Sequence, residues 1–139
     1  MLDIALATIY KIPFQKVSRS ILSYSIPGLL SDYRQTPFTF RDGLSEWKGT
    51  GFLCVAEYQN ELAGIMRLDE KRTYWDLSSF VVSPKFRGNG IGNDLLNSIF
   101  FDKPIYLKVK QDNPAITLYQ KNNFKQVAVS NGRYIMKLS

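Results

Sequence analysis

The stretch "SPKFRGNGIGNDLL" at residues 83–96 constrains the fold more than any other part of this chain. Three glycines alternate there at positions 88, 90 and 92, directly after an apolar run and directly before a helical pattern. Glycine costs backbone entropy wherever it is placed, so such a cluster needs a reason. The arrangement predicts a strand, a tight turn and a helix. Either the glycines only make the turn, or they bring its backbone close to a phosphate-bearing ligand.

The patterns on either side of this turn predict one mixed α/β (α+β) domain that spans residues 1–139. Residues 14–35 are expected to form two short helices, and residues 36–50 a loop. Turns at Gln59-Asn60 and Asn131-Gly132 predict two hairpins. Strands are expected at 1–10, 51–58, 61–70, 73–83, 105–111, 124–130 and 133–139.

Two further helices are predicted after the glycine turn. The first carries one apolar stripe at helical spacing, formed by Ile91, Leu95, Leu96 and Ile99. The second begins at Asn113 and Pro114, because asparagine caps helices and proline suits the first helical position. It ends at Asn122-Asn123, since asparagine tolerates the left-handed conformation that closes helices.

The lack of histidine excludes much of the usual catalytic chemistry. The chain has no histidine and one cysteine, Cys54, inside the apolar run "GFLCVA". No Ser-His or Cys-His nucleophile pair and no internal disulfide can form, and we expect no metal. A general base must therefore be a carboxylate, a lysine, a tyrosine or water. Cysteine usage and the lack of a signal peptide or a membrane-length apolar run favour a cytoplasmic protein with no membrane partner.

The positive charge leaves the partner open. The net charge is +6 and the sequence pI is about 9.5, but the basic residues are dispersed along the chain. A nucleic acid is one candidate, and the interleaved "YLKVK" at 106–110 would suit a surface that follows phosphates. A phosphate-rich cofactor or an acidic partner explains the charge equally well.

Two familiar phosphate-binding loops do not fit the glycine turn. A P-loop requires a Lys-Ser/Thr pair after its last glycine, whereas Asn93-Asp94 follow here. A dinucleotide fingerprint that starts at Gly88 would need glycine at position 93, and too few strand–helix units remain after it. The turn therefore belongs to another class of loop.

The spacing that fits is Arg-x-x-Gly-x-Gly, formed by Arg87, Gly90 and Gly92. In its context, "DLSSFVVSPKFRGNGIGNDLL", it resembles the central signature of the Gcn5-related N-acetyltransferases, the GNAT family. A second block, "LKVKQDNPAITLYQKNNF", resembles the family's "L.V...N..A..LY.K.GF", and the two blocks together cover residues 73–124. The resemblance implies the GNAT acyl-CoA N-acyltransferase fold: a mixed central sheet of about six to seven strands, whose fourth and fifth strands splay apart, with flanking helices.

The same resemblance implies where acetyl-CoA binds. Its pyrophosphate would contact the backbone of the loop, namely Arg87, Gly88, Asn89, Gly90, Ile91 and Gly92. Its pantetheine arm would pair with the strand backbone at Phe80, Val81 and Val82. Asn113 would also contact the cofactor, although capping alone explains an asparagine at that position.

The resemblance also implies two residues that transfer protons during the reaction. Tyr119 stands where many GNAT enzymes keep the tyrosine that protonates the CoA sulfur, and the alternative is a tyrosine packed on the buried face of its helix. Asp76, eleven residues before Arg87, matches the position of the family's carboxylate base and should share a strand face with Ser78. Because aspartate is shorter than the usual glutamate, we expect a bridging water. The alternative is an exposed aspartate at a strand end. Other candidate bases are then Glu57, Glu61, Asp69 and Glu70, and the resemblance also allows that no strong base is needed, because many family members accept a partly neutral substrate.

The implied activity is N-acetylation. The resemblance predicts direct transfer of the acetyl group of acetyl-CoA to a primary amine of a small molecule or protein, by a monomer or a homodimer. The alternatives are an RNA-linked or aminoacyl-tRNA amine, and a non-catalytic module that only binds acyl-CoA. The acceptor site is expected to come from residues 14–48 and 125–135, which carry few acids and so disfavour a polycationic acceptor.

Overall fold

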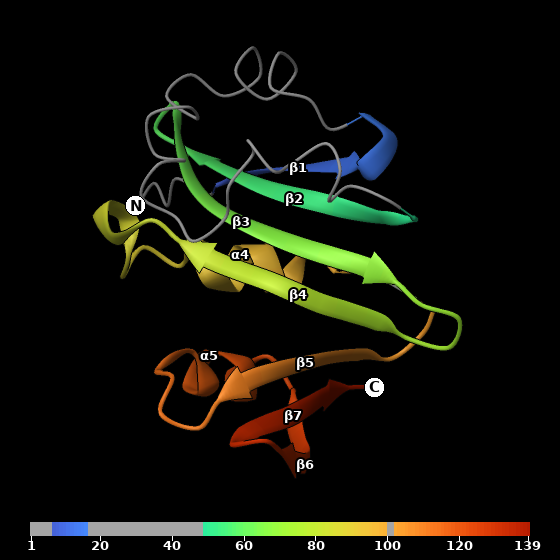
Figure 1. The fold of residues 1–139 in the computed structure, drawn as a ribbon. Coiled ribbons are helices and arrows are strands. Elements are labelled where there is room, and N and C mark those ends of the chain that lie inside the picture. The colour runs from blue at the N-terminus through green and yellow to red at the C-terminus, as the bar shows by residue number, and fades with distance from the viewer. Residues whose placement is uncertain (1–6, 17–48, 100–101) are drawn as a thin grey trace.

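The computed structural model describes residues 7–16, 49–99 and 102–139, which form a seven-stranded sheet with two α-helices (Figure 1). The strand order is β1-β2-β3-β4-β5-β7-β6, and β4–β5 is the parallel pair. None of the helices in these residues is long and apolar enough to span a membrane. The strands are β1 Thr8–Pro13, β2 Gly51–Tyr58, β3 Glu61–Glu70, β4 Trp75–Val82, β5 Ile105–Lys110, β6 Lys125–Ser130 and β7 Arg133–Leu138.

Both predicted hairpins are confirmed. Gln59 and Asn60 have φ values of 53° and 61°, and Asn131 and Gly132 have φ values of 51° and 75°. Positive φ at both central residues is the requirement of a two-residue turn that matches the twist of its strands. Local turn chemistry therefore fixes how β2 pairs with β3 and how β6 pairs with β7.

The first strand lies further along the chain than the sequence predicted. The expectation was residues 1–10, whereas β1 runs to Pro13 and continues into a 3₁₀ turn, η1, at Phe14–Lys16. Pro13 is tolerated because, among the described strands, β1 lies at the edge of the sheet and pairs with β2 alone. The two helices predicted within residues 14–35 and the loop predicted for 36–50 fall mostly on residues 17–48, outside the described part of the chain.

Helix α5, Ala115–Lys121, has the caps that the sequence predicted. The Asn113 Oδ1 accepts a hydrogen bond of 2.8 Å from the Ala115 N–H, and Pro114 already has helical backbone angles. At the other end Asn123 has φ 71°, and the Phe124 N–H donates to the Tyr119 carbonyl at 3.0 Å. This closure of the helix places the Phe124 ring against the Tyr119 ring.

One face of the sheet packs against α5 and α4, the latter at Ile91–Asn97. Three residues of the predicted stripe, Ile91, Leu95 and Leu96, are buried in this core, and Ile99 packs against it. Cys54 lies in the same core with 1% of its surface exposed, and burial raises the pKa of its thiol to about 11. The opposite face of β2 and β3 buries a second apolar set, Leu53, Val55 and Ile65.

Strands β4 and β5 splay apart, as expected of the fold. They pair at only two positions, Trp75 with Ile105 and Asp76 with Tyr106. Next along β4 comes a β-bulge, because Leu77 and Ser79 pair with the adjacent β3 residues Leu68 and Arg67 and leave Ser78 extra. A bulge bends its strand and increases the local twist. The carboxyl-terminal halves of β4 and β5 are therefore separated, as Figure 1 shows.

The bulge also changes which residues of β4 face the helices. In a regular strand that places Leu77 on the helix-bearing face, the residues at 79 and 81 would share that face. Because of the extra residue, Phe80 pairs with Met66 and lies on the helix side, with its Cζ near α4. The apolar end of β4 is thereby turned toward both helices.

Candidate active site

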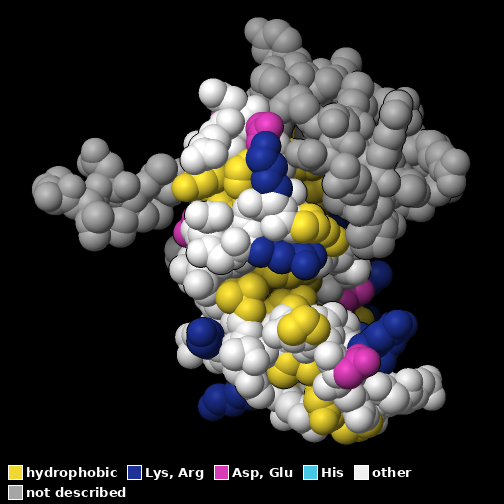
Figure 2. All heavy atoms as spheres, turned by 90° about the vertical axis from the view of Figure 1, so that its left-hand side faces the viewer, with side chains coloured by type: hydrophobic (Ala, Val, Ile, Leu, Met, Phe, Trp, Pro, Cys, Tyr) yellow, Lys and Arg dark blue, Asp and Glu magenta, His cyan; other side chains and the backbone are white. Residues whose placement is uncertain are grey.

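A cavity of about 680 Å³ lies where β4 and β5 separate, between the glycine loop and the start of α5. Figure 2 shows this side of the molecule, with hydrophobic side chains gathered in the hollow and Lys and Arg side chains at its rim. The volume is within the range of pockets that bind small molecules and cofactors. Its described lining comprises Phe80, Val81, Val82, Phe86, Arg87, Gly88, Gly90, Ile91, Gly92, Asn93, Asn113, Pro114, Ala115, Leu118 and Tyr119.

The glycine loop presents bare backbone to this cavity. Gly88 and Gly90 have φ values of 86° and 79°, and a Cβ at either residue would meet no atom within 4 Å. The first hydrogen bond of α4 runs from the Asp94 N–H to the Gly90 carbonyl at 3.0 Å. The N–H groups of Ile91 and Gly92 therefore precede the hydrogen-bond ladder of the helix. Such N–H groups, with the positive end of the helix dipole, favour an anion.

Gly92 serves a different purpose from the other two glycines. A Cβ on Gly92 would lie 2.6 Å from the Leu118 Cδ2 and 3.4 Å from the Phe80 Cζ. The missing side chain lets α4 approach α5 and β4 closely. The sequence suggested one role for all three glycines. In the structure Gly88 and Gly90 border open space, whereas Gly92 is required for close packing.

Asn89 shapes the loop from within. Its side-chain amide donates to the Phe86 carbonyl at 3.0 Å, and Asn89 is not among the described residues that line the cavity. Arg87 ties the loop to the sheet, since its Nε donates to the Val82 carbonyl at 3.4 Å. Arg87 is exposed, so its guanidinium is available to a ligand at the rim.

The end of β4 offers a second set of backbone groups. Phe80, Val81 and Val82 pair with β3 on one edge, and β4 has no recorded partner in β5 beyond Asp76. In a strand, successive residues direct their N–H and C=O groups to opposite edges. The cavity therefore borders an edge whose hydrogen-bonding groups are open to an extended ligand.

Tyr119 connects this cavity to a second one. The second cavity, of about 330 Å³, is also lined by Phe80, Asn113 and Tyr119. Tyr119 is 6% exposed, and its ring packs edge-on against Phe80, with ring centroids 5.6 Å apart, and against Phe124, at 5.9 Å. Burial raises the pKa of the Tyr119 phenol to about 12. The hydroxyl therefore keeps its proton over the whole physiological range.

Asp76 is half-buried at the start of β4, beside both strands that flank it. It lies opposite Asp69 across β3–β4 and pairs with Tyr106 on β5. Burial raises the pKa of the Asp76 carboxyl, and the negative charge of Asp69 adds to the effect. The charges of Lys71, Lys108 and Arg67 act in the opposite direction. Asp76 lines neither cavity among the described residues, although its neighbour Leu77 lines the second.

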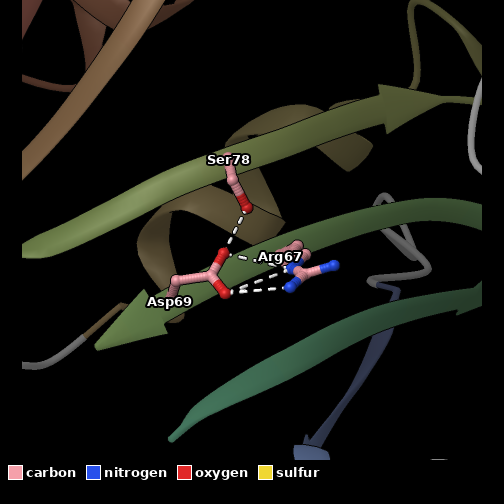
Figure 3. A network of polar contacts seen from close by, with 3 residues as sticks. All are labelled: Arg67, Asp69 and Ser78. Carbon is pink, nitrogen blue, oxygen red and sulfur yellow. Dashed lines mark hydrogen bonds and ion pairs between the residues drawn. The ribbon is translucent and has the colours of Figure 1, made fainter. Parts of the chain in front are cut away.

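Asp69 is held in a polar network at the bulge (Figure 3). Its carboxylate accepts hydrogen bonds of 3.0 Å from the Nε and from a terminal nitrogen of Arg67, and one of 2.5 Å from the Ser78 hydroxyl. Arg67 and Asp69 each have 16% of their side-chain surface exposed. The network joins β3 to the bulged residue, and the Ser78 hydroxyl lies on the Asp69–Asp76 side of the sheet, as strand alternation predicted.

The structure brings together nearly all residues that the sequence selected. Nine of the ten predicted cofactor residues, all but Asn89, line the first cavity together with Tyr119. Sequence reasoning did not select Phe86 and Leu118, although Leu118 lies one residue before Tyr119 on the predicted helix. It also did not select as site residues the other polar residues that line the second cavity, namely Ser78, Ser79, Lys108, Lys110 and Arg133.

Comparison with known proteins identifies the family. The family model described as an acetyltransferase (GNAT) domain matches residues 49–126, more than half of the chain, and no curated protein sequence matches significantly. The fold is similar to that of the ribosomal-protein-S18-alanine N-acetyltransferase of Escherichia coli, with 17% identity, a TM-score of 0.71, and 96% of this chain and 93% of that one covered.

Two further solved structures share the fold. Arabidopsis thaliana Naa50, in complex with the bisubstrate analogue CoA-Ac-MVNAL, has 21% identity and a TM-score of 0.61, with 94% of this chain and 98% of that chain covered. A GNAT family acetyltransferase from Elizabethkingia anophelis with acetyl-CoA bound has 18% identity and a TM-score of 0.61, with 96% and 97% covered. In this chain the first cavity combines a bare glycine loop with an open strand edge. This chain belongs to the GNAT acetyltransferase family.

Proposed function

We propose that this protein transfers the acetyl group of acetyl-CoA directly to a primary amine of a small molecule or protein. One observation carries the proposal: a single cavity is bordered by the glycine loop, the open edge of β4 and Tyr119. The glycine loop can bind an anion, the open edge of β4 can pair with an extended arm, and the Tyr119 hydroxyl can donate a proton. Of two proteins with the same fold, one is described as an alanine N-acetyltransferase and the other is in complex with the bisubstrate analogue CoA-Ac-MVNAL, which supports an amine acceptor.

Binding of acetyl-CoA is assigned to backbone groups. Within the 87–92 loop the N–H groups of Arg87 and Asn89 already donate to backbone carbonyls. The N–H groups of the remaining loop residues would hold the pyrophosphate, and the Arg87 side chain at the rim would add a positive charge. The edge of β4 at Phe80–Val82 would pair with the pantetheine amides. These contacts orient the thioester and are the same for every acceptor.

Transfer requires two proton movements. The neutral amine attacks the thioester carbonyl carbon, a C–N bond forms, and the C–S bond breaks to release the thiolate of CoA. The Tyr119 hydroxyl gives its proton to that thiolate, and the amine's proton passes to Asp76 through a bridging water. Burial raises the pKa of Tyr119 to about 12, so the hydroxyl carries the proton that the thiolate takes up.

An acceptor screen that detects the released thiol tests the proposal. We expect acetyl-CoA to bind in calorimetry and to be consumed with amines, with a product heavier by one acetyl group in mass spectrometry. A folded protein that binds acetyl-CoA but acetylates no amine would support the non-catalytic alternative. A folded protein that does not bind acetyl-CoA would refute the assignment of the cavity.

A further inference from the structure

The second cavity carries a concentration of positive charge. Three of its lining residues are cationic, Lys108 and Lys110 on β5 and Arg133 at the start of β7. All three side chains are exposed, and none of the ion pairs recorded in the described residues involves them. We infer that the acceptor amine is a small molecule that also carries a carboxylate or phosphate, and that Lys108, Lys110 and Arg133 bind this anionic group. The inference rests on the proposed function and names its substrate class.

The sheet places these three cations on one surface. Alternation along β5 buries Leu107 and Val109 and directs Lys108 and Lys110 to the opposite face. Arg133 pairs directly with Lys110 across the antiparallel β5–β7 ladder, so the two side chains project from the same face. The Cβ atoms of such a pair are about 5 Å apart.

This placement is unfavourable for the fold alone. Like charges directly opposite each other in a ladder destabilise a sheet, and Lys108 adds a third charge two residues along the same face. A bound anion removes the repulsion, because it can accept hydrogen bonds from all three side chains. The cost to the free protein and the position in a cavity that shares Tyr119 with the acetyl-CoA site both indicate a ligand.

The opposite end of this surface is acidic. Asp76 lies on the same face as Lys108, since it pairs with Tyr106 and Tyr106 and Lys108 are two residues apart. The two groups interact, because the positive charge of Lys108 lowers the pKa of Asp76. An acceptor with an ammonium or amine at one end and an anion at the other matches this order of charges. The cavity volume of about 330 Å³ limits the bound part to a small molecule.

Paired probes test the inference. The probes are β-alanine with its neutral amide β-alaninamide, and O-phosphoethanolamine with ethanolamine, each assayed for acetyl-CoA-dependent thiol release. The variants are Lys110→Gln, Arg133→Gln and the double substitution, and the control is Lys121→Gln, an exposed lysine of α5 that lines neither cavity. The ratio of kcat/KM for the anionic and neutral members is compared between variants, which cancels the intrinsic reactivity of each amine.

We expect the double variant to lower kcat/KM for one anionic probe by ~10-fold or more and to change its neutral partner by less than about twofold, with Lys121→Gln unchanged. A higher kcat/KM for β-alanine would indicate a carboxylate-bearing acceptor, and a higher kcat/KM for O-phosphoethanolamine a phosphate-bearing one. Acetyl-CoA affinity by calorimetry should not change, and the denaturation midpoint should not fall, since a like-charge pair has been removed.

Equal effects on charged and neutral probes, or no effect on either, would overturn the inference while leaving the acetyltransferase function intact. If no probe is acetylated, NMR saturation transfer from the protein–CoA complex to O-phosphoethanolamine or β-alanine decides: binding lost in the double variant supports the inference, and no binding overturns it. Inhibition by a ten-nucleotide RNA at lower concentration than either anionic probe would overturn it in favour of an RNA-linked acceptor. Failure to bind acetyl-CoA removes the proposed function and this inference together.

Discussion

Substitution of Gly90 separates the backbone, steric and electrostatic parts of cofactor binding. Gly90 has φ 79°, and a Cβ there would enter open space beside the first cavity. Any other residue at this φ costs about 1–2 kcal/mol. A domain with about 5–15 kcal/mol of stability remains folded after that loss. We expect Gly90→Ala, Gly90→Gln and Gly90→Glu to melt a few degrees below the parent, and at similar temperatures.

The electrostatic part follows from Coulomb's law. Two negative charges 4 Å apart repel by about 4 kcal/mol at an effective dielectric constant of 20. Gly90 is exposed, so salt and solvent reduce this repulsion to about 2 kcal/mol. That free energy corresponds to a dissociation constant raised ~30-fold. Gly90→Gln has the same size without the charge, so the difference between Gly90→Glu and Gly90→Gln isolates the repulsion.

Calorimetric titration with acetyl-CoA at low and high salt measures this difference. We expect affinity to fall from the parent through Gly90→Ala and Gly90→Gln to Gly90→Glu, and the last step to shrink as salt is added. If folded Gly90→Glu and Gly90→Gln bind acetyl-CoA equally well, no phosphate lies near this loop. The assignment of the pyrophosphate to residues 87–92 would then be wrong.

Three further outcomes are expected. Tyr119→Phe keeps the ring against Phe80 and Phe124, so turnover by thiol release should fall by ~10²-fold with acetyl-CoA affinity unchanged, and full turnover would leave Tyr119 as a packing residue. Because the pKa of Asp76 is raised in the folded protein, its charged form lowers stability at pH 7, but not at pH 3, which lies below the ordinary pKa of an aspartate. Asp76→Asn should therefore raise the urea midpoint of unfolding at pH 7 and leave it unchanged at pH 3. Turnover should fall in the same variant, and the acidic limb of the pH–rate profile should disappear. The Cys54 thiol, buried and with its pKa raised to about 11, should resist iodoacetamide at pH 8 in the folded protein, as intact mass would report, and rapid alkylation would contradict the burial.

The sequence predicted correctly the turns and helix ends whose conformation depends on residues close together in the chain. The Gln59-Asn60 turn and the caps of α5 depend on side chains and φ values within a few residues. The start and end of β1 were not predicted in the same way, because an edge strand is defined by its pairing with a distant strand, here β2. The residues of β1 and their immediate neighbours in sequence do not indicate where such pairing begins and ends.

In the candidate site, too, the residues predicted from the sequence belong to local motifs, and the features that were missed depend on strand pairing. Motif spacing selected the loop and Tyr119, because a loop binds ligand through residues adjacent in sequence. The bulge at Ser78 could not be predicted from alternation, which would have turned Phe80 away from the helices. The cluster of Lys108, Lys110 and Arg133 was also missed, since Arg133 reaches it only through the β5–β7 register. The sequence suggested instead that the same lysines could follow the phosphates of a nucleic acid.

The short β4–β5 ladder has a consequence for how the protein opens. Two residue pairs connect the strands β1 to β4 with the group β5, β7 and β6, so few backbone hydrogen bonds resist separation of the two parts of the sheet. Amide hydrogens along this seam should exchange with solvent by local opening, faster than those of the long β2–β3 ladder. Acetyl-CoA bound as proposed, between the two parts, would supply hydrogen bonds that the strands do not make with each other. At a hundredfold excess over its dissociation constant it stabilises the closed sheet by about 2.7 kcal/mol, and the slowing of exchange should be greatest along the open edge of β4.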